Sequence, residues 1–271
     1  MHEFAVLAAG EDAEISVDQF ALGYWLIPLS LGISVLGATI GLACIMHSMR
    51  SVQFRLVWLA SAALSLGGVG AWLSTSVAML GLKVSGSSLR YDSTKLSTAL
   101  VVAIATVFVA VLIIGRRPRP PLLAAGGLVL GLGIGTMHYL GVGSIAIQGS
   151  VDVTFWLVAV SAALGVSTAT GILWSFQAMR FPLARVVTVV LFAVGMAATY
   201  YTALAALDFD VDPSARMPSG TKLFDFVFPM FVIGLLALTA PISAVLVAPD
   251  RREVEPVSAN QPHQPNLEPA Y

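Results

Sequence analysis

Seven long apolar runs set the strongest limit on what this chain can fold into. Each run has about 20 residues or more, and the only charged residue in any of them is Arg185, near the start of the sixth run. A hydrocarbon core of about 30 Å is crossed by a helix of about 20 apolar residues. The sequence therefore predicts an all-α polytopic membrane protein with seven transmembrane helices. The runs are Leu22–Met46, Leu56–Leu80, Leu96–Gly115, Pro121–Ile145, Val153–Ser175, Leu183–Leu207 and Phe226–Val247.

The charge content agrees with this fold class and excludes other classes of protein. Only 11% of the 271 residues are charged and 57% are hydrophobic, whereas soluble domains are about 25% charged. The net charge of −1 offers no basic face for nucleic acid, so we exclude nucleic acid as a partner. The single cysteine, Cys44, has no second cysteine for a disulfide or for a zinc site.

Basic residues predict the orientation in the cell membrane. The loops at one end of the predicted helices hold nine Lys and Arg residues, and the loops at the other end hold five. Short basic loops stay on the cytoplasmic side. The N-terminus is therefore expected outside and the C-terminus in the cytoplasm. The cytoplasmic set is Arg50, Arg55, Arg116, Arg117, Arg119, Arg180, Arg185, Arg251 and Arg252.

The two ends of the chain differ from the apolar middle. Residues 1–21 are expected to form an extracytoplasmic segment, and they lack the basic region of a cleavable signal peptide, so the first helix is expected to be an uncleaved anchor. Residues 22–248 form the predicted membrane domain. Residues 249–271 are rich in Pro, Asn and Gln and are expected to be a disordered cytoplasmic tail.

Internal spacing indicates three tandem helix pairs followed by a seventh helix. Basic turns recur every 62–65 residues or so. Near the outer end of the second helix of each pair, polar side chains interrupt the apolar run. Thr75, His138 and Tyr200 occupy matching positions, 63 and 62 residues apart. We expect these three side chains to lie beside one another.

His138 is the main candidate for a functional residue, because an ionisable side chain at membrane depth usually faces protein interior or a cavity. Gly127, Gly131 and Gly135 have the spacing that lets helices approach closely in lipid. His138 follows on the same helix face and is predicted to point into the bundle. There it can bind a metal, move a proton or hydrogen-bond a neighbouring helix.

The pentapeptide Met137–Gly141 resembles the motif of the bacterial MHYT domain, an integral membrane sensor module named for a Met-His-Tyr-Thr motif repeated at the outer ends of alternate helices. The resemblance extends over most of the chain, through the three helix pairs, the seventh helix and Tyr91-Asp92 before the third helix. One motif of three is intact. The other two have Ser74, Thr75 and Ser76 in the first repeat, and Thr199 and Tyr200 in the third.

The resemblance implies a sensor in the cell membrane that holds copper and detects oxygen, carbon monoxide or nitric oxide. Thioether and imidazole ligands together favour copper, and the implied ligands are His138, Met137 and Met79. Adjacent residues point about 100° apart on a helix, so Met137 and His138 do not naturally share one ion. Copper is the only cofactor that the sequence predicts.

We predict a stand-alone sensory or signalling module that acts through an unknown protein partner and is not an enzyme, because a lone histidine among hydroxyl groups lacks the partners of a catalytic triad. Two alternatives stay open. One is a small transporter or channel, although the spans hold none of the carboxylates or lysines that ion coupling usually needs. The other is an MHYT-like protein with a structural or partner-binding role and no metal.

Overall fold

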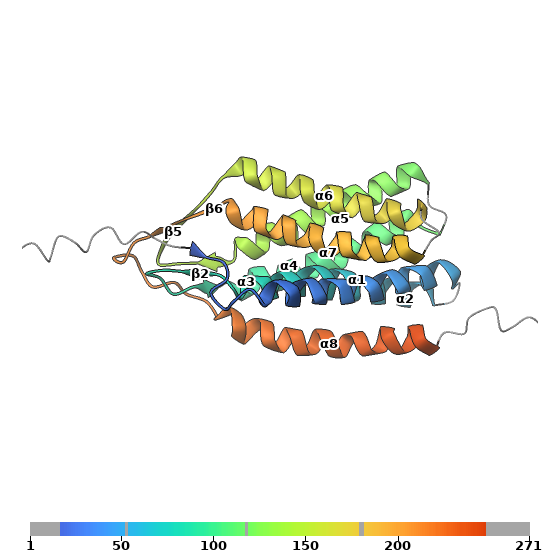
Figure 1. Cartoon of the computed structure of the whole chain (residues 1–271), viewed down its shortest axis with the longest axis horizontal. Coiled ribbons are helices and arrows are strands. Elements are labelled where there is room, and N and C mark those ends of the chain that lie inside the picture. The colour runs from blue at the N-terminus through green and yellow to red at the C-terminus, as the bar shows by residue number, and fades with distance from the viewer. Residues whose placement is uncertain (1–16, 52–53, 117–118, 179–181, 248–271) are drawn as a thin grey trace, which may run out of the picture.

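The structure, a computed structural model, describes residues 17–51, 54–116, 119–178 and 182–247. In this part of the chain, seven helical spans are long and apolar enough to cross a membrane. They run side by side in an elongated bundle (Figure 1). The protein is therefore an all-α multi-pass membrane protein, as expected. The spans are α1 (Leu26–Arg50), the continuous α2 (Arg55–Ala63), η1 (Leu64–Leu73) and α3 (Ser74–Met79), then α4 (Ser93–Ile114), α5 (Pro120–Val142), α6 (Phe155–Ala178), α7 (Pro182–Ala205) and α8 (Leu223–Val247).

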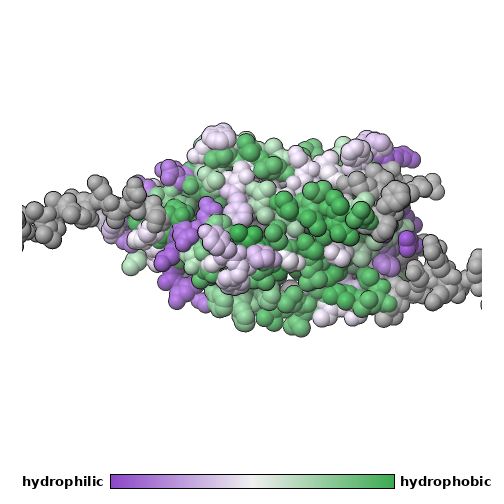
Figure 2. All heavy atoms as spheres, in the orientation of Figure 1, coloured by the Kyte–Doolittle hydropathy of each residue, from purple (hydrophilic) through white to green (hydrophobic). Residues whose placement is uncertain are grey.

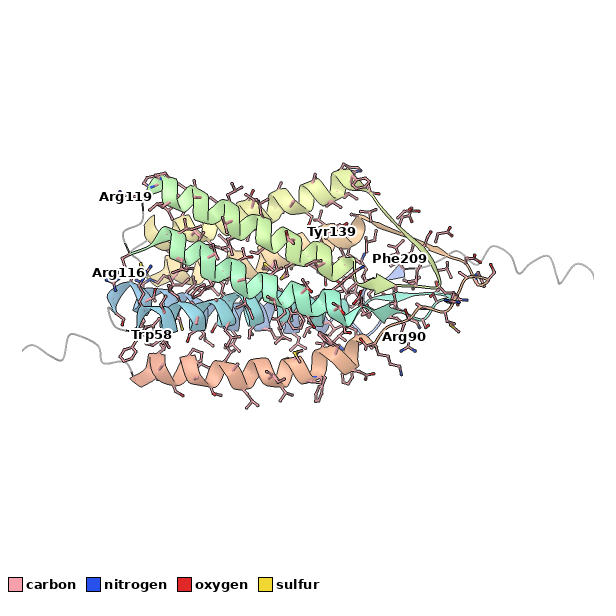
Figure 3. All side chains as sticks on the ribbon, turned by 180° about the vertical axis from the view of Figure 1, so that it is seen from behind. Trp58, Arg90, Arg116, Arg119, Tyr139 and Phe209 are labelled. Atoms are coloured by element: carbon pink, nitrogen blue, oxygen red, sulfur yellow. The ribbon has the colours of Figure 1, made fainter. Side chains whose placement is uncertain are left out.

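The surface of the bundle has the polarity of a membrane protein. Hydrophobic residues dominate the middle of the face in Figure 2, and hydrophilic residues gather toward its two ends. Arg116 and Arg119 mark one end, and Arg90 lies at the other, beside the strands (Figure 3). We call these the arginine end and the strand end.

Six of the spans form a closed ring, and the seventh lies outside it. Each span from α1 to α7 contacts the next one along the chain, and α7 returns to contact α1. Helix α8 packs on the outside of this ring, against α1, η1 and α3, as Figure 1 shows. Only 17% of the most apolar 18-residue stretch of α8 is buried in the described structure. Helix α8 is therefore peripheral.

Short antiparallel strands close each helix pair at the strand end. One strand precedes the first helix of a pair, and its partner follows the second helix. The same order recurs three times, which confirms the three tandem helix pairs and the added seventh helix. The strand pairs are β1 (Val17–Asp18) with β2 (Lys83–Val84), β3 (Arg90–Tyr91) with β4 (Ile145–Ala146), and β5 (Gly149–Val153) with β6 (Leu207–Val211).

The strands correct three of the expected helix ends. Ile145, Val153 and Leu207 are predicted inside spans but lie in β4, β5 and β6. Apolar residues at the end of a long run suit a helix or a strand equally well, and here pairing with a distant segment decides. The first span begins at Leu26 and not at Leu22, because Gly23 turns the chain with a φ of 99°, a conformation that glycine adopts without strain.

The first helix pair packs through a glycine contact. A Cβ atom built on Gly37 of α1 would lie 2.4 Å from the backbone nitrogen of Gly70 in η1. Only glycine permits this approach. Segment η1 is wound as a π-helix, which is wider than an α-helix and is found frequently at functional sites.

The two predicted terminal segments lie largely outside the described residues. Residues 1–16 of the expected N-terminal segment lie outside the described residues, and so does the whole of the expected tail, residues 249–271. Both predictions stay predictions.

Candidate functional site

His138 lies in the last turns of α5, near the strand end, and its side chain is only 2% exposed. The glycine ladder before it sets this direction. Cβ atoms built on Gly127, Gly131 and Gly135 would meet α6 residues, with Thr170, Val166 and Ala162 nearest in turn. The ladder therefore packs on α6, and the predicted inward direction of His138 is confirmed.

A hydrogen bond joins the His138 ring to the backbone of its own helix. Nδ1 lies 2.9 Å from the carbonyl oxygen of Ile134, one turn earlier in α5. A carbonyl only accepts, so in the tautomer that makes this bond Nδ1 donates and Nε2 is an acceptor. The main-chain carbonyl of Met196 in α7 lies near the ring, but it is an acceptor too. Nε2 is buried and has no hydrogen-bond partner among the described residues.

A cavity of about 90 Å³ lies beside His138, between α5, α6 and α7 at the strand end. His138, Tyr139 and Ser161 are the polar side chains of its lining. The Ser161 hydroxyl donates to the carbonyl of Thr199 over 2.9 Å, a bond that ties α6 to α7. Tyr139 is 58% exposed and lies on the surface toward the strand end (Figure 3). The rest of the lining is Gly135, Val142, Gly143, Val153, Val158, Ala162, Ala203 and Leu207.

Thr75 and Tyr200 meet at a different and smaller cavity of about 10 Å³, which is room for about one water molecule. Ser34 and Met196 also line it. The Ser34 hydroxyl is buried there without a hydrogen-bond partner in the described part of the chain. Matching repeat positions thus bring Thr75 and Tyr200 together as predicted, whereas His138 lines the cavity next to them.

The three predicted copper ligands do not line one cavity. Met79 and Met137 are buried, and the Met79 sulfur lies 3.9 Å from a Cβ built on Gly141, about one turn beyond His138. Neither sulfur lines the His138 cavity, and Met196 lines the smaller one. The His138 cavity thus supplies one nitrogen and no thioether, which does not fit a copper ion held by these residues. We derive no chemistry through copper, and its binding stays a prediction.

The region around His138 is similar in sequence to a known protein family. Residues 131–189 match the MHYT family, described as "Bacterial signalling protein N terminal repeat". The chain carries an MHYT repeat. The matched segment begins at Gly131 in α5, includes His138 and ends in α7, so it contains most of the helices around the cavity.

Two curated relatives extend the match beyond this MHYT repeat. The chain is 29% identical over 208 residues to "Cyclic di-GMP phosphodiesterase NbdA" of Pseudomonas aeruginosa, which covers 73% of this chain and 25% of NbdA. It is 28% identical over 175 residues to an "Uncharacterized signaling protein" of Caulobacter vibrioides, covering 64% of this chain and 21% of that protein. The chain thus spans about a quarter of the length of these relatives or less. No solved structure matches it significantly.

The chain is thus a multi-pass membrane protein by its seven spans, and it is similar to membrane regions of signalling proteins around its MHYT repeat. The Tyr91-Asp92 pair that supports the likeness has a structural role here. Asp92 accepts hydrogen bonds from the backbone nitrogens of Thr94 and Lys95 and so caps α4. Tyr91 pairs through its backbone with Thr221 before α8. Burial raises the pKa of the Tyr91 phenol well above its ordinary range, so the phenol stays neutral.

Two residues that line the His138 cavity could not be identified from the sequence. Val153 and Leu207 line it from the ends of β5 and β6, and their apolar runs predict helix at these positions. Ser161 has a signal, because serines recur early in the first helix of each pair, at Ser30, Ser97 and Ser161. That recurrence marks Ser161 as a repeat position and does not reveal its contact with the cavity.

Proposed function

We propose that this chain is the sensory part of a bacterial signalling system, which receives a signal at the strand end and changes cellular cyclic di-GMP through a partner protein. The observation that carries the proposal is the alignment with NbdA, which covers 73% of this chain and 25% of NbdA. A membrane module shared with a phosphodiesterase of cyclic di-GMP supports the same second messenger here. We assign the chain itself no catalytic role.

The proposed direction of the signal is from outside to inside. The strand end, with the His138 cavity, faces outward in the orientation that the basic loops favour. The arginine end then lies in the cytoplasm, where the partner binds. Burial of His138 beside a cavity supports its assignment to signal reception, because an unpaired polar group is costly in a membrane protein.

Measurement of cyclic di-GMP in the host bacterium tests this function. We expect deletion of the gene to change the nucleotide level at least twofold, and the wild-type chain to restore it. His138→Ala should fail to restore it, whereas His47→Ala should succeed, because His47 stacks on Trp58 with 4.8 Å between ring centroids, far from the cavity. An unchanged level in the deletion strain, or full restoration by His138→Ala, contradicts the proposal.

Gas sensing through copper is the finer prediction from the family resemblance, and it needs its own test. Purified chain is loaded with Cu(I) under anaerobic conditions, dialysed and analysed for metal. If copper is held by Met79, Met137 and His138, the wild type retains about one ion and His138→Ala loses most of it. In cells, nitric oxide should then change cyclic di-GMP in the wild type alone. Absence of retained copper removes this prediction and leaves the signalling proposal in place.

Transport is the competing function, and flux through proteoliposomes separates the two. Polar side chains line the two cavities of about 90 and 10 Å³ at the strand end, and Ser167, Thr168 and Thr188 line a third of about 360 Å³ between α6 and α7. No Asp, Glu, Lys or Arg lines any of these three cavities, so we expect no flux of small ions above that of empty liposomes. Flux that His138→Ala abolishes contradicts the sensory proposal.

A further inference from the structure

We infer that the cavity between α6 and α7 binds an uncharged, lipid-soluble molecule that has an apolar body and a carbonyl group. The cavity is open along one side, and we call it the α6–α7 groove. The inference goes beyond the proposed function, which assigns signal reception to the strand end, and it does not rest on that assignment. Its evidence is the volume and lining of the groove and the hydroxyl group of Thr168.

Small residues leave the space of the α6–α7 groove. Helices α6 and α7 lie side by side (Figure 1), and the groove between them measures about 360 Å³. Gly171 of α6 and Gly195 of α7 line it and have no side chain to fill it. Ser167, Gly171 and Leu191 are exposed along it in the described structure. The groove is therefore accessible from the lipid beside the bundle.

The Thr168 side chain points from α6 toward α7. Its methyl and hydroxyl groups are the nearest atoms to a Cβ built on Gly195, and both residues line the groove. The Thr168 hydroxyl makes no hydrogen bond within the described part of the chain. The unpaired polar atoms that are fully enclosed belong to other residues, namely Ser34, Ser65 and His138. The Thr168 oxygen is thus unpaired and accessible at the groove.

The matching threonine of the preceding repeat has a different hydrogen bond. Thr106 and Gly133 lie 62 residues before Thr168 and Gly195, and Thr106 packs against Gly133 in the same way. The Thr106 hydroxyl, however, donates to the carbonyl of Val102 over 2.6 Å, and Thr106 does not line the groove. Threonine in a helix can satisfy its hydroxyl through such a bond to the preceding turn. Thr168 therefore keeps a donor that the matching residue has already used.

The polar group of the ligand must accept a hydrogen bond. Ser167 and Thr188 also line the groove, but their hydroxyls donate to the carbonyls of Ala163 and Ala184 in their own helices. Thr168 is therefore the side chain of the described lining whose hydroxyl proton is free. A polar group without a partner is costly in an apolar environment, and the carbonyl oxygen of a ligand would accept this proton.

The depth of Thr168 requires a ligand that is uncharged and soluble in lipid. Helix α6 has 24 residues, and Thr168 lies about 20 Å from its first residue and about 15 Å from its last. The ester groups of phospholipids lie outside the hydrocarbon core, which is about 30 Å thick, so they do not reach this depth. No Asp, Glu, Lys or Arg of the described chain lines the groove to pair with a charged ligand.

The volume of the groove allows a ligand larger than benzene. A cavity of about 150 Å³ binds benzene, and the groove has more than twice that volume. Ile172, Leu191 and Val194 supply apolar walls. A molecule of two fused rings with one carbonyl, such as 1-tetralone, is therefore a suitable probe.

Two probes that differ in the carbonyl test the inference on the full-length chain in lipid nanodiscs. 1-Tetralone and tetralin have the same fused rings, but only 1-tetralone has a carbonyl. The isoleucine methyl groups are labelled with ¹³C, and the signal of Ile172 is assigned by its loss in Ile172→Val. With probe amounts expressed per lipid, we expect both probes to shift this signal in a saturable way. 1-Tetralone should bind at least threefold more tightly, because it gains one hydrogen bond.

Valine variants test the role of the Thr168 hydroxyl. Thr168→Val keeps the branched shape of the side chain and removes the hydroxyl. It should weaken binding of 1-tetralone at least threefold, to the level of tetralin, and leave tetralin within twofold of the wild type. Retained binding of tetralin shows that the variant is folded. Thr106→Val is the matched control, because its hydroxyl is already paired, and it should leave both probes within twofold.

Two glycines locate the site. A Cβ built on Gly171 or on Gly32 would meet nothing within 4 Å, but only Gly171 lines the groove. Gly171→Leu should fill the groove and weaken both probes at least tenfold, and Gly32→Leu should leave both within twofold of the wild type. The comparison of the two probes in the wild type needs no variant, so a misfolded variant does not remove the test.

Three results would overturn the inference. They are the absence of a saturable response of Ile172 to 1-tetralone, equal binding of the two probes to the wild type, and undiminished binding to Gly171→Leu. Equal binding would identify a groove for hydrocarbon chains alone. Because binding is measured on purified protein, these results are independent of the cyclic di-GMP measurement. A chain that binds 1-tetralone but leaves cyclic di-GMP unchanged would keep the site and lose the proposed output.

Discussion

At the scale of single residues, the polar side chains at the strand end serve chiefly to satisfy backbone groups. Asp92 accepts from two backbone nitrogens at the start of α4, and Lys95 donates to the carbonyl of Gly143 at the end of α5 over 2.7 Å. Helix ends leave backbone groups unpaired, and these two side chains satisfy some of them. His138 is different, because its second nitrogen has no such bond among the described residues.

The cap at Asp92 gives a prediction for stability. Asp92→Ala removes both hydrogen bonds to the backbone of α4, and loss of an N-cap of this kind costs about 1 kcal/mol. Asp92→Asn keeps an oxygen acceptor and should retain most of the stability. Thermal unfolding in detergent, followed by circular dichroism, compares the two variants with the wild type. Equal melting temperatures for Asp92→Ala and the wild type would show that the cap contributes nothing.

Asp212 gives a prediction for pH dependence in the loop after β6. A hydrogen bond from the Ser214 hydroxyl, 2.6 Å long, and one from its backbone nitrogen lower the pKa of the Asp212 carboxyl below its ordinary value of 3.8. A lowered pKa means that the turn is stabilised above that value and loses this contribution as the pH falls through the pKa of the folded state. Ser214→Ala should therefore raise the titration midpoint of Asp212, measured by carboxyl ¹³C shifts. An unchanged midpoint would rule out this hydrogen bond as the cause.

At the scale of elements, glycines let neighbouring helices pack closely, both within a helix pair and between pairs. Gly37 brings α1 against η1, and Gly131 brings α5 against α6. Association of helices in lipid relies on close packing, because the lipid tails are as apolar as the side chains. The sequence reveals the second contact through its ladder of glycines. The first involves a segment wound as a π-helix, and no residue pattern predicts that winding.

Two glycines of α1 give a matched pair of substitutions. A Cβ built on Gly37 would collide with Gly70 and with the backbone oxygen of Ser65, whereas one built on Gly32 meets nothing within 4 Å. Gly37→Ala should destabilise the protein by about 1–3 kcal/mol, the usual range for overpacking. Gly32→Ala should be neutral or stabilise it by up to about 1 kcal/mol, because alanine favours helix. Chemical unfolding in mixed micelles measures both. Similar effects of the two variants would contradict the close approach.

At the scale of the whole molecule, the sequence predicts the number of spans and their pairing, because charge, length and repeat spacing each depend on local residues. It does not predict the strands. β5 pairs with β6 across more than 50 residues of chain, and strands of two to five residues carry too few side chains for a periodic pattern. For the same reason the sequence does not predict the cavity, because Val153 and Leu207, which line it, are brought together by this strand pairing. The inward direction of His138 was predictable from the glycines beside it.

Orientation is a prediction for the whole chain and is tested by labelling. With Cys44 replaced by alanine, one new cysteine is placed at Ser88 on the strand end or at Arg119 on the arginine end, both exposed. If the basic loops stay in the cytoplasm, a membrane-impermeant maleimide labels Ser88→Cys in intact cells. Arg119→Cys should react only after the cells are opened. The reverse pattern would invert the proposed direction of signalling.

The three strand pairs also decide where the bundle can move. Backbone hydrogen bonds hold the two chain segments of each pair about 4.8 Å apart, so a change in helix tilt has its pivot at the strand end. Helix α4 has 22 residues and is therefore about 33 Å long, so a tilt of about 10° displaces its far end by about 6 Å. A slight spreading around the His138 cavity, close to the pivot, would thus become a movement of several ångströms at the arginine end. The same change in tilt thus moves residues near the cavity only slightly and moves the arginine end, where a partner would bind, much further.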